Sequence, residues 1–344
     1  MNFLAFGILT SYAGLIVALF GFITASWKRW KSNLHHGLVV MSLVSFAHTW
    51  YYMFSFIKWS FDDYKSRHPA PSSATIERAS DWLTNTKLFE QAWAVVSTGL
   101  YNWWWSEQLC LFTAGPWTAF LFFESKRLQI PHVWAYMFLG QVVAISVASN
   151  LFFIAIRLAM SEPSSSPTRR LGQPLCASPW VWIPIFVSLA TIWRTPAVAG
   201  TSEFLPNLLV MHVLLFAPFI PPSIVPFEIP GRISSTWLYA ILGSASLVIR
   251  ARTLREIMSL PTDDSVIARL WETLHSHPAQ SSIGWDVIWT TISFILYFTL
   301  FADGGGDRVS VGTLIVDGIG SLFVSISIVA STRLMAREAA LAAA

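Results

Sequence analysis

Charged residues are scarce in this chain of 344 residues: they make up 12% of the sequence, against about 25% in ordinary soluble domains. Apolar residues make up 54%, so too little charge is present to coat a water-facing surface. The two cysteines, Cys110 and Cys176, exclude a framework of several disulfides and form no Cys-x-x-Cys motif. The net charge is only +3, and nucleic acid is therefore not an expected partner.

Long apolar runs are abundant, and their lengths are typical of helices that cross a hydrocarbon core about 30 Å thick. The runs cover residues 3–27, 36–59, 103–123, 131–160, 179–193, 204–224, 236–249, 285–301 and 311–330. We predict an all-α fold in which residues 1–344 form one transmembrane domain, a polytopic bundle with eight or nine spanning helices.

The fifth run is the reason for the two alternatives, because it is short and contains Pro184. With nine spans, Lys and Arg divide almost evenly between the two sides of the membrane, 12 against 10. With eight spans they divide 15 against 7, and this bias places both termini in the cytosol because basic loops tend to stay inside.

Three segments between the runs have a different composition. Residues 79–96 and 265–274 mix acidic, basic and Trp side chains, which predicts helices at the membrane surface, with solvated connectors as the alternative. Residues 161–177 are rich in Ser and Pro and are predicted to form a flexible loop.

Ionisable residues inside the apolar runs are few, and Glu107 is the first of them. Each costs about 2.5 to 3.5 kcal/mol at the bilayer centre, so such residues usually face the bundle interior and have a function. Glu107 shares a helix face with Trp103 and Trp104, and burial against indole rings keeps a carboxyl group protonated as a usable acid. A helix-bridging hydrogen bond from Gln108 or Gln141 is the structural alternative.

Asp317 and Asp286 are the other two predicted catalytic residues. Asp317 belongs to a polar stripe with a four-residue spacing that runs from Thr313 to Ser325, which predicts one face of a single helix. Asp286 begins a similar stripe, although its place near a predicted helix start also permits a capping role.

Polar and aromatic residues at helical spacing complete the predicted site. Packing and ordinary hydrogen bonds are the alternative for most of them, His48 above all. The predicted substrate-binding residues are His48, Tyr52, Trp103, Trp104, Gln108, Gln141, Asn150, Trp289 and Ser321.

A family resemblance rests on residues 102–158, about one sixth of the chain. This stretch has a Trp-rich polar start (NWWWSEQ), a basic turn at Lys126 and Arg127, then Gly140-Gln141 and the sequence NLFF from Asn150. It resembles fungal integral-membrane terpene cyclases of meroterpenoid pathways, such as those that make ascofuranone, ascochlorin and macrophorin.

The resemblance implies proton-initiated cyclisation of a farnesyl or epoxyfarnesyl chain on a prenylated substrate, in the endoplasmic reticulum membrane. It implies no metal and no other cofactor, and the expected partners are the prenylated small molecule and the lipid bilayer. Such a reaction needs a buried acid, an apolar chamber, aromatic faces that stabilise a cation and a final base. The oligomeric state is not predicted.

Three other functions fit the same sequence. A transporter would use the intramembrane carboxylates to line a path for a proton or a small molecule. A scaffold protein would use its polar residues only for structural contacts. A magnesium-dependent intramembrane prenyltransferase would bring together two pairs of acids, which are Asp62 with Asp63 and Asp263 with Asp264.

Overall fold

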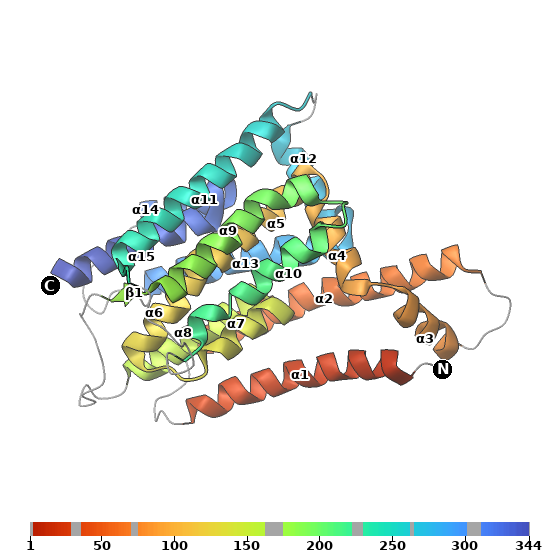
Figure 1. The fold of residues 1–344 in the computed structure, drawn as a ribbon, viewed down its shortest axis with the longest axis horizontal. Coiled ribbons are helices and arrows are strands. Elements are labelled where there is room, and N and C mark those ends of the chain that lie inside the picture. Colours follow the sequence, from red (N-terminus) through yellow and green to blue (C-terminus); the bar gives the residue numbers. More distant parts are fainter. Residues whose placement is uncertain are drawn as a thin grey trace.

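The computed structural model describes residues 3–28, 36–69, 75–161, 175–221, 230–261, 265–300 and 311–343. Almost all of these residues are helical, which confirms the predicted helical fold class. Many of the helices lie side by side, with α1 at one edge of the molecule (Figure 1). One short antiparallel pair joins β1 (Cys176–Ala177) to β2 (Ile233–Ser234).

The helices follow one another closely along the chain, and short π-helical or 3-10 turns extend some of them. In order they are α1 (Phe3–Trp27), α2 (His36–Arg67), α3 (Thr75–Asn85), α4 (Leu88–Ser97), α5 (Leu100–Phe112), the π-helical turn η1 (Thr113–Trp117), α6 (Thr118–Leu128), α7 (Val133–Val142), α8 (Ile145–Met160), α9 (Pro179–Val198), α10 (Phe204–Leu214), the 3-10 turn η2 (Ala217–Phe219), α11 (Ser235–Met258), α12 (Val266–Ser276), α13 (Pro278–Leu300), α14 (Val311–Gly320), the π-helical turn η4 (Ser321–Ser325) and α15 (Ile326–Ala343).

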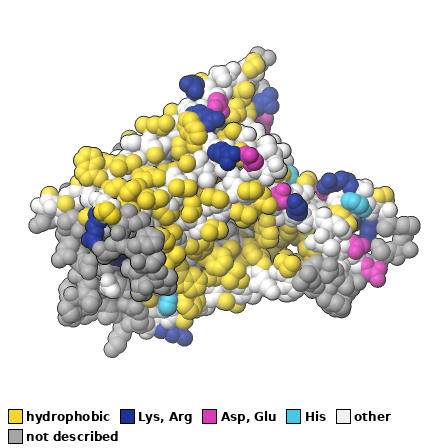
Figure 2. All heavy atoms as spheres, in the orientation of Figure 1, with side chains coloured by type: hydrophobic (Ala, Val, Ile, Leu, Met, Phe, Trp, Pro, Cys, Tyr) yellow, Lys and Arg dark blue, Asp and Glu magenta, His cyan; other side chains and the backbone are white. Residues whose placement is uncertain are grey.

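Four helical segments are long and apolar enough to cross a membrane. They are Gly7–Trp27, His36–Arg67, Pro179–Val198 and, counted by length and composition through the bend at residues 321–325, Gly312–Ala343. The outer surface carries the side chains expected beside lipid, since Val17, Leu43 and Phe54 are each at least 60% exposed. Hydrophobic side chains cover much of the face in Figure 2, while charged ones gather toward the ends of the molecule.

The first departure from a regular helix is η1, which joins α5 to α6 within the predicted run 103–123. Pro116 lies inside this turn; proline has no backbone N–H and its ring clashes with the preceding helical turn. The helix widens by one π-helical turn, and the Thr118 hydroxyl donates to the Thr113 carbonyl at 2.7 Å. The chain therefore continues in one direction with a local bulge.

The predicted run 131–160 is divided into two helices, which corrects the expectation of one spanning helix. At the break, the backbone N–H groups of Ile145 and Ser146 donate to the Asp286 carboxylate at 2.8 and 2.9 Å. On the other side, the Tyr12 hydroxyl donates to the Val142 carbonyl. Because both freed ends have partners from distant helices, the break is stable inside the bundle.

The run 311–330 also departs from the prediction, because α14, η4 and α15 do not form one straight helix. Asp317 and Arg333 are 16 residues apart and would be separated by about 24 Å along a straight helix. Instead, Arg333 donates two hydrogen bonds to the Asp317 carboxylate, each of 2.9 Å. The chain therefore bends back near η4, and the predicted stripe from Thr313 to Ser325 is not the face of one helix.

The two predicted surface segments between the apolar runs are largely helical. Residues 79–96 fall on α3 and α4, which are separated at Thr86 and Lys87, and residues 265–274 fall mainly on α12. Their position at a membrane surface stays a prediction. Most of the predicted flexible loop 161–177 lies outside the described residues, and its last two residues form β1.

Candidate active site

The carboxyl group of Glu107 lies in the interior of the helix bundle, at 1% exposure. Glu107 is on α5, a helix in which most residues are buried. One carboxylate oxygen accepts a hydrogen bond from Arg250 at 3.1 Å, and the other accepts one from the Thr253 hydroxyl at 2.6 Å. Both oxygens are therefore engaged by donors from α11, which is the arrangement that a carboxylate anion prefers.

Arg250 connects three parts of the chain through its buried guanidinium group. Besides Glu107, it donates to the Trp104 carbonyl on α5 at 2.9 Å and to the Val324 carbonyl in η4 at 2.7 Å. The guanidinium carbon also lies 4.3 Å from the centre of the Trp104 ring, a cation–π contact. Arg250 thus neutralises Glu107 and satisfies a carbonyl of the π-helical turn.

Gln108 and Ser321, two of the predicted substrate-binding residues, lie next to Arg250. With the Gln108 amide oriented by its hydrogen-bond network, its nitrogen donates to the Ser321 carbonyl at 3.1 Å. Its oxygen then accepts from Arg250 at 3.2 Å. We call Glu107, Gln108, Arg250, Thr253 and Ser321 the Glu107 cluster.

The three consecutive tryptophans do not act as one aromatic wall, because successive residues on a helix point in different directions. Trp104 packs against the Arg250 guanidinium, whereas the Trp105 indole donates to the Leu270 carbonyl at 3.0 Å. Trp103 is buried one turn before Glu107. The three indoles therefore have different surroundings.

The three predicted catalytic carboxylates have separate sets of partners. Glu107 pairs with Arg250 and Thr253, Asp286 caps α8, and Asp317 pairs with Arg333. Asp286 lies well inside α13, so its capping role concerns another helix rather than the start of its own. Each of the three carboxylates therefore has structural partners, and their catalytic roles stay predictions.

His48, Tyr52 and Trp289 come together where α2 packs against α13. The Trp289 indole donates to Nδ1 of His48 at 3.0 Å, and the rings of His48 and Tyr52 are 5.5 Å apart. Trp285 adds a further aromatic contact, 4.4 Å from His48. These residues form a half-buried aromatic cluster with its own hydrogen bond.

Gln141 and Asn150 lie on the two halves of the interrupted helix. Gln141 donates to the carbonyl of His212 on α10 at 3.3 Å. Asn150 is fully buried on α8, one helical turn beyond Ser146, whose N–H binds Asp286. Neither residue contacts the Glu107 cluster through a hydrogen bond in the described part of the chain.

A second buried charge cluster was not predicted from the sequence. Arg127 on α6 pairs with Glu124 and donates two hydrogen bonds to Glu338 on α15, at 2.7 and 2.8 Å. Arg337 donates to both oxygens of Glu124, at 2.9 and 3.2 Å, and the Ser235 hydroxyl donates to Glu338 at 2.5 Å. These five residues, the Glu124 cluster, balance two positive charges with two negative ones.

Of the two acid pairs considered as metal ligands, the structure describes only Asp62 with Asp63. Asp62 pairs with Lys65 and Asp63 with Arg67 at the end of α2, while Asp263 and Asp264 lie outside the described residues. Across the described ranges, no group of three or more His, Cys, Asp or Glu side chains is placed to hold a metal ion. Both cysteines are free thiols.

Comparisons with known proteins add no relative. No family model matches the sequence, and no curated protein or solved structure is significantly similar to it.

Proposed function

We propose that the chain is an integral membrane terpene cyclase. In this proposal it carries out proton-initiated cyclisation of a farnesyl or epoxyfarnesyl meroterpenoid precursor in the endoplasmic reticulum membrane, without a cofactor. The four long apolar helices are consistent with a membrane location, and the shorter helices complete a bundle of eight or nine spans in the proposal.

The observation that supports the proposal most strongly is the burial of Glu107 between a cation, a hydroxyl and an indole. Protonation of an epoxide or an alkene requires a strong acid, whose carboxylate must be stabilised after the proton has left. Arg250 and Thr253 donate to that carboxylate at 3.1 and 2.6 Å. Aromatic faces stabilise a desolvated cation by about 2 kcal/mol or more, and Trp103 is the indole buried one helical turn from Glu107.

The proposed reaction is an isomerisation. In the proposed reactive state, Glu107 has first taken up a proton. That proton moves to the epoxide oxygen or to a carbon of the terminal alkene, which leaves a carbocation on the chain, and the Glu107 carboxylate returns to its pairing with Arg250. Successive C=C bonds attack the cation and become ring C–C bonds. The last cation loses a proton to the Glu107 carboxylate, so the acid is restored and the product has the mass of the substrate.

Conversion in membranes tests the function. We expect fungal membranes that contain the chain to convert a farnesyl or epoxyfarnesyl phenol into a product of unchanged mass with fewer alkene signals in the NMR spectrum. Membranes of the same host without the chain are the control. If the folded chain leaves all offered prenylated phenols unchanged, the cyclase proposal fails.

A transporter is the second candidate, because α7 and α8 form an interrupted helix. Interrupted helices in membranes often border the path of a substrate or ion, and here the break is held by the intramembrane carboxylate of Asp286. Uptake of a solute into proteoliposomes without any change in its chemical structure would favour this candidate over the cyclase.

A further inference from the structure

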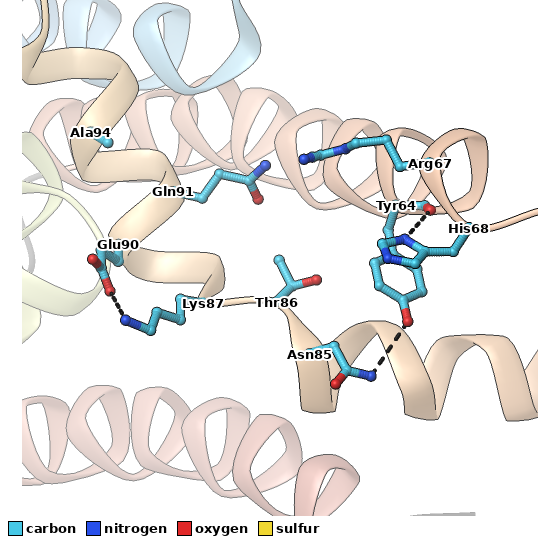
Figure 3. A pocket seen from close by; sticks show the side chains of 9 residues that line it. All are labelled: Tyr64, Arg67, His68, Asn85, Thr86, Lys87, Glu90, Gln91 and Ala94. Carbon is cyan, nitrogen blue, oxygen red and sulfur yellow. Dashed lines mark hydrogen bonds and ion pairs between the residues drawn. The ribbon is translucent and has the colours of Figure 1, made fainter. Parts of the chain in front are cut away.

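A pocket of about 640 Å³ lies at the end of α2, apart from the Glu107 cluster. The last turn of α2 forms one wall. The connection from α3 to α4, which contains Thr86, forms the other (Figure 3). Arg67 and His68 come from α2, while Lys87 comes from the connection. The pocket thus lies between the end of α2 and the start of α4.

Buried hydrogen bonds fix the positions of the three helices that surround the pocket. The Trp82 indole on α3 donates to the hydroxyl of Ser60 on α2 at 3.1 Å, and that hydroxyl donates to the side chain of Gln91 on α4 at 2.7 Å. Ser60 is 1% exposed and therefore links all three helices inside the protein. The pocket is consequently formed before any ligand arrives.

The polar groups around the pocket favour an anion. Arg67 and Lys87 supply two cations and Thr86 a hydroxyl, whereas Glu90 is the acidic residue of the lining. The Asn85 amide already donates to the Asp81 carbonyl and to the Tyr64 hydroxyl. The acidic partners of the two cations, Asp63 for Arg67 and Glu90 for Lys87, form solvent-accessible ion pairs. Pairs of this kind are worth about 0 to 1 kcal/mol, so both cations can turn to a stronger acceptor such as phosphate.

In the proposed membrane orientation, the length of α2 puts the pocket at the level of the lipid headgroups. Its 32 residues extend about 48 Å, whereas the hydrocarbon core is about 30 Å thick. The apolar part of the helix ends near Trp59, and the following turns carry Asp62, Asp63, Lys65 and Arg67. Trp59 and Tyr64 are of the type that marks a membrane interface.

We propose that this pocket binds the phosphate of an anionic membrane lipid. Arg67 and Lys87 contact the phosphate oxygens, the Thr86 hydroxyl donates a further hydrogen bond, and the acyl chains lie along the apolar surface of α2. This site is independent of the proposed cyclase activity. Free inorganic phosphate could bind the same groups, and the experiment distinguishes it from a lipid phosphate.

The test uses the full-length protein in detergent and measures binding of dioctanoyl phosphatidic acid, dioctanoyl phosphatidylcholine and inorganic phosphate by thermophoresis. We expect the acidic lipid to bind at least about tenfold more tightly than either of the others. The double variant Arg67→Gln/Lys87→Gln should lose about tenfold in affinity for it, since each cation makes a charge-assisted hydrogen bond.

The matched control is Lys65→Gln/Arg194→Gln, which removes two cations that also form exposed pairs but do not line the pocket. Its affinity should stay within about twofold of the wild type, because a general loss of charge has only a screened effect. Equal binding of phosphatidic acid and inorganic phosphate would overturn the lipid assignment. An unchanged affinity in the Arg67/Lys87 variant would overturn the site.

Discussion

Replacement of Arg250 by Met is expected to lower the free energy of unfolding by about 3 to 5 kcal/mol. The substitution leaves the Glu107 carboxylate buried without its cation, and uncompensated charges of this kind are strongly destabilising. It also removes the donor to the Val324 carbonyl in η4. Unfolding of the purified protein in a detergent titration measures the change.

The pairing itself is tested by the double variant Glu107→Gln/Arg250→Met. It should recover a large part of the lost stability, because a neutral Gln no longer needs the cation. Arg194→Met is the control, since Arg194 and Glu203 form an exposed pair and their loss should cost about 1 kcal/mol or less. Simple addition of the two single effects in the double variant would show that the pair is not coupled.

Replacement of Arg127 by Met is also expected to destabilise the protein, again by about 3 to 5 kcal/mol. Arg127 is the cation that binds both oxygens of Glu338, and it also pairs with Glu124. Its loss leaves two negative charges facing one positive charge, that of Arg337, inside the protein. The same detergent titration reports the loss.

Arg127→Lys separates charge from geometry in this cluster. A lysine keeps the positive charge but has one nitrogen, whereas Arg127 binds Glu124 through Nη1 and Glu338 through Nη2. We therefore expect only partial recovery relative to Arg127→Met. Full stability in Arg127→Met would contradict the view that the Glu124 cluster fastens α15 to α6.

The sequence was sufficient to predict the helical class and the burial of Glu107, because both follow from short-range composition. It could not identify the cation that pairs with Glu107. The predicted apolar run ends at residue 249, whereas α11 continues to Met258 and carries Arg250 and Thr253 one turn apart on a buried face. An ion pair across 143 residues leaves no local pattern.

The interruptions of the helices were equally hidden. The run 131–160 is predominantly apolar, and its polar residues do not mark the break after Val142. The break depends on Asp286 and Tyr12, which come from distant segments and supply the acceptor and donor that the helix loses there. The Glu124 cluster was missed for the same reason, since Arg127 and Glu338 are 211 residues apart.

Product formation by Glu107→Gln tests the central claim most directly. Gln keeps the size of Glu and one acceptor oxygen but cannot donate an acidic proton. The variant also leaves Arg250 without its anion, so the folded fraction in detergent is measured first and the rate of cyclisation per folded protein should fall by about 10²- to 10⁴-fold. Asp317→Asn, which changes a paired carboxylate outside the Glu107 cluster, should stay within a few-fold of the wild type. Cyclisation by Glu107→Gln at the wild-type rate would contradict the account.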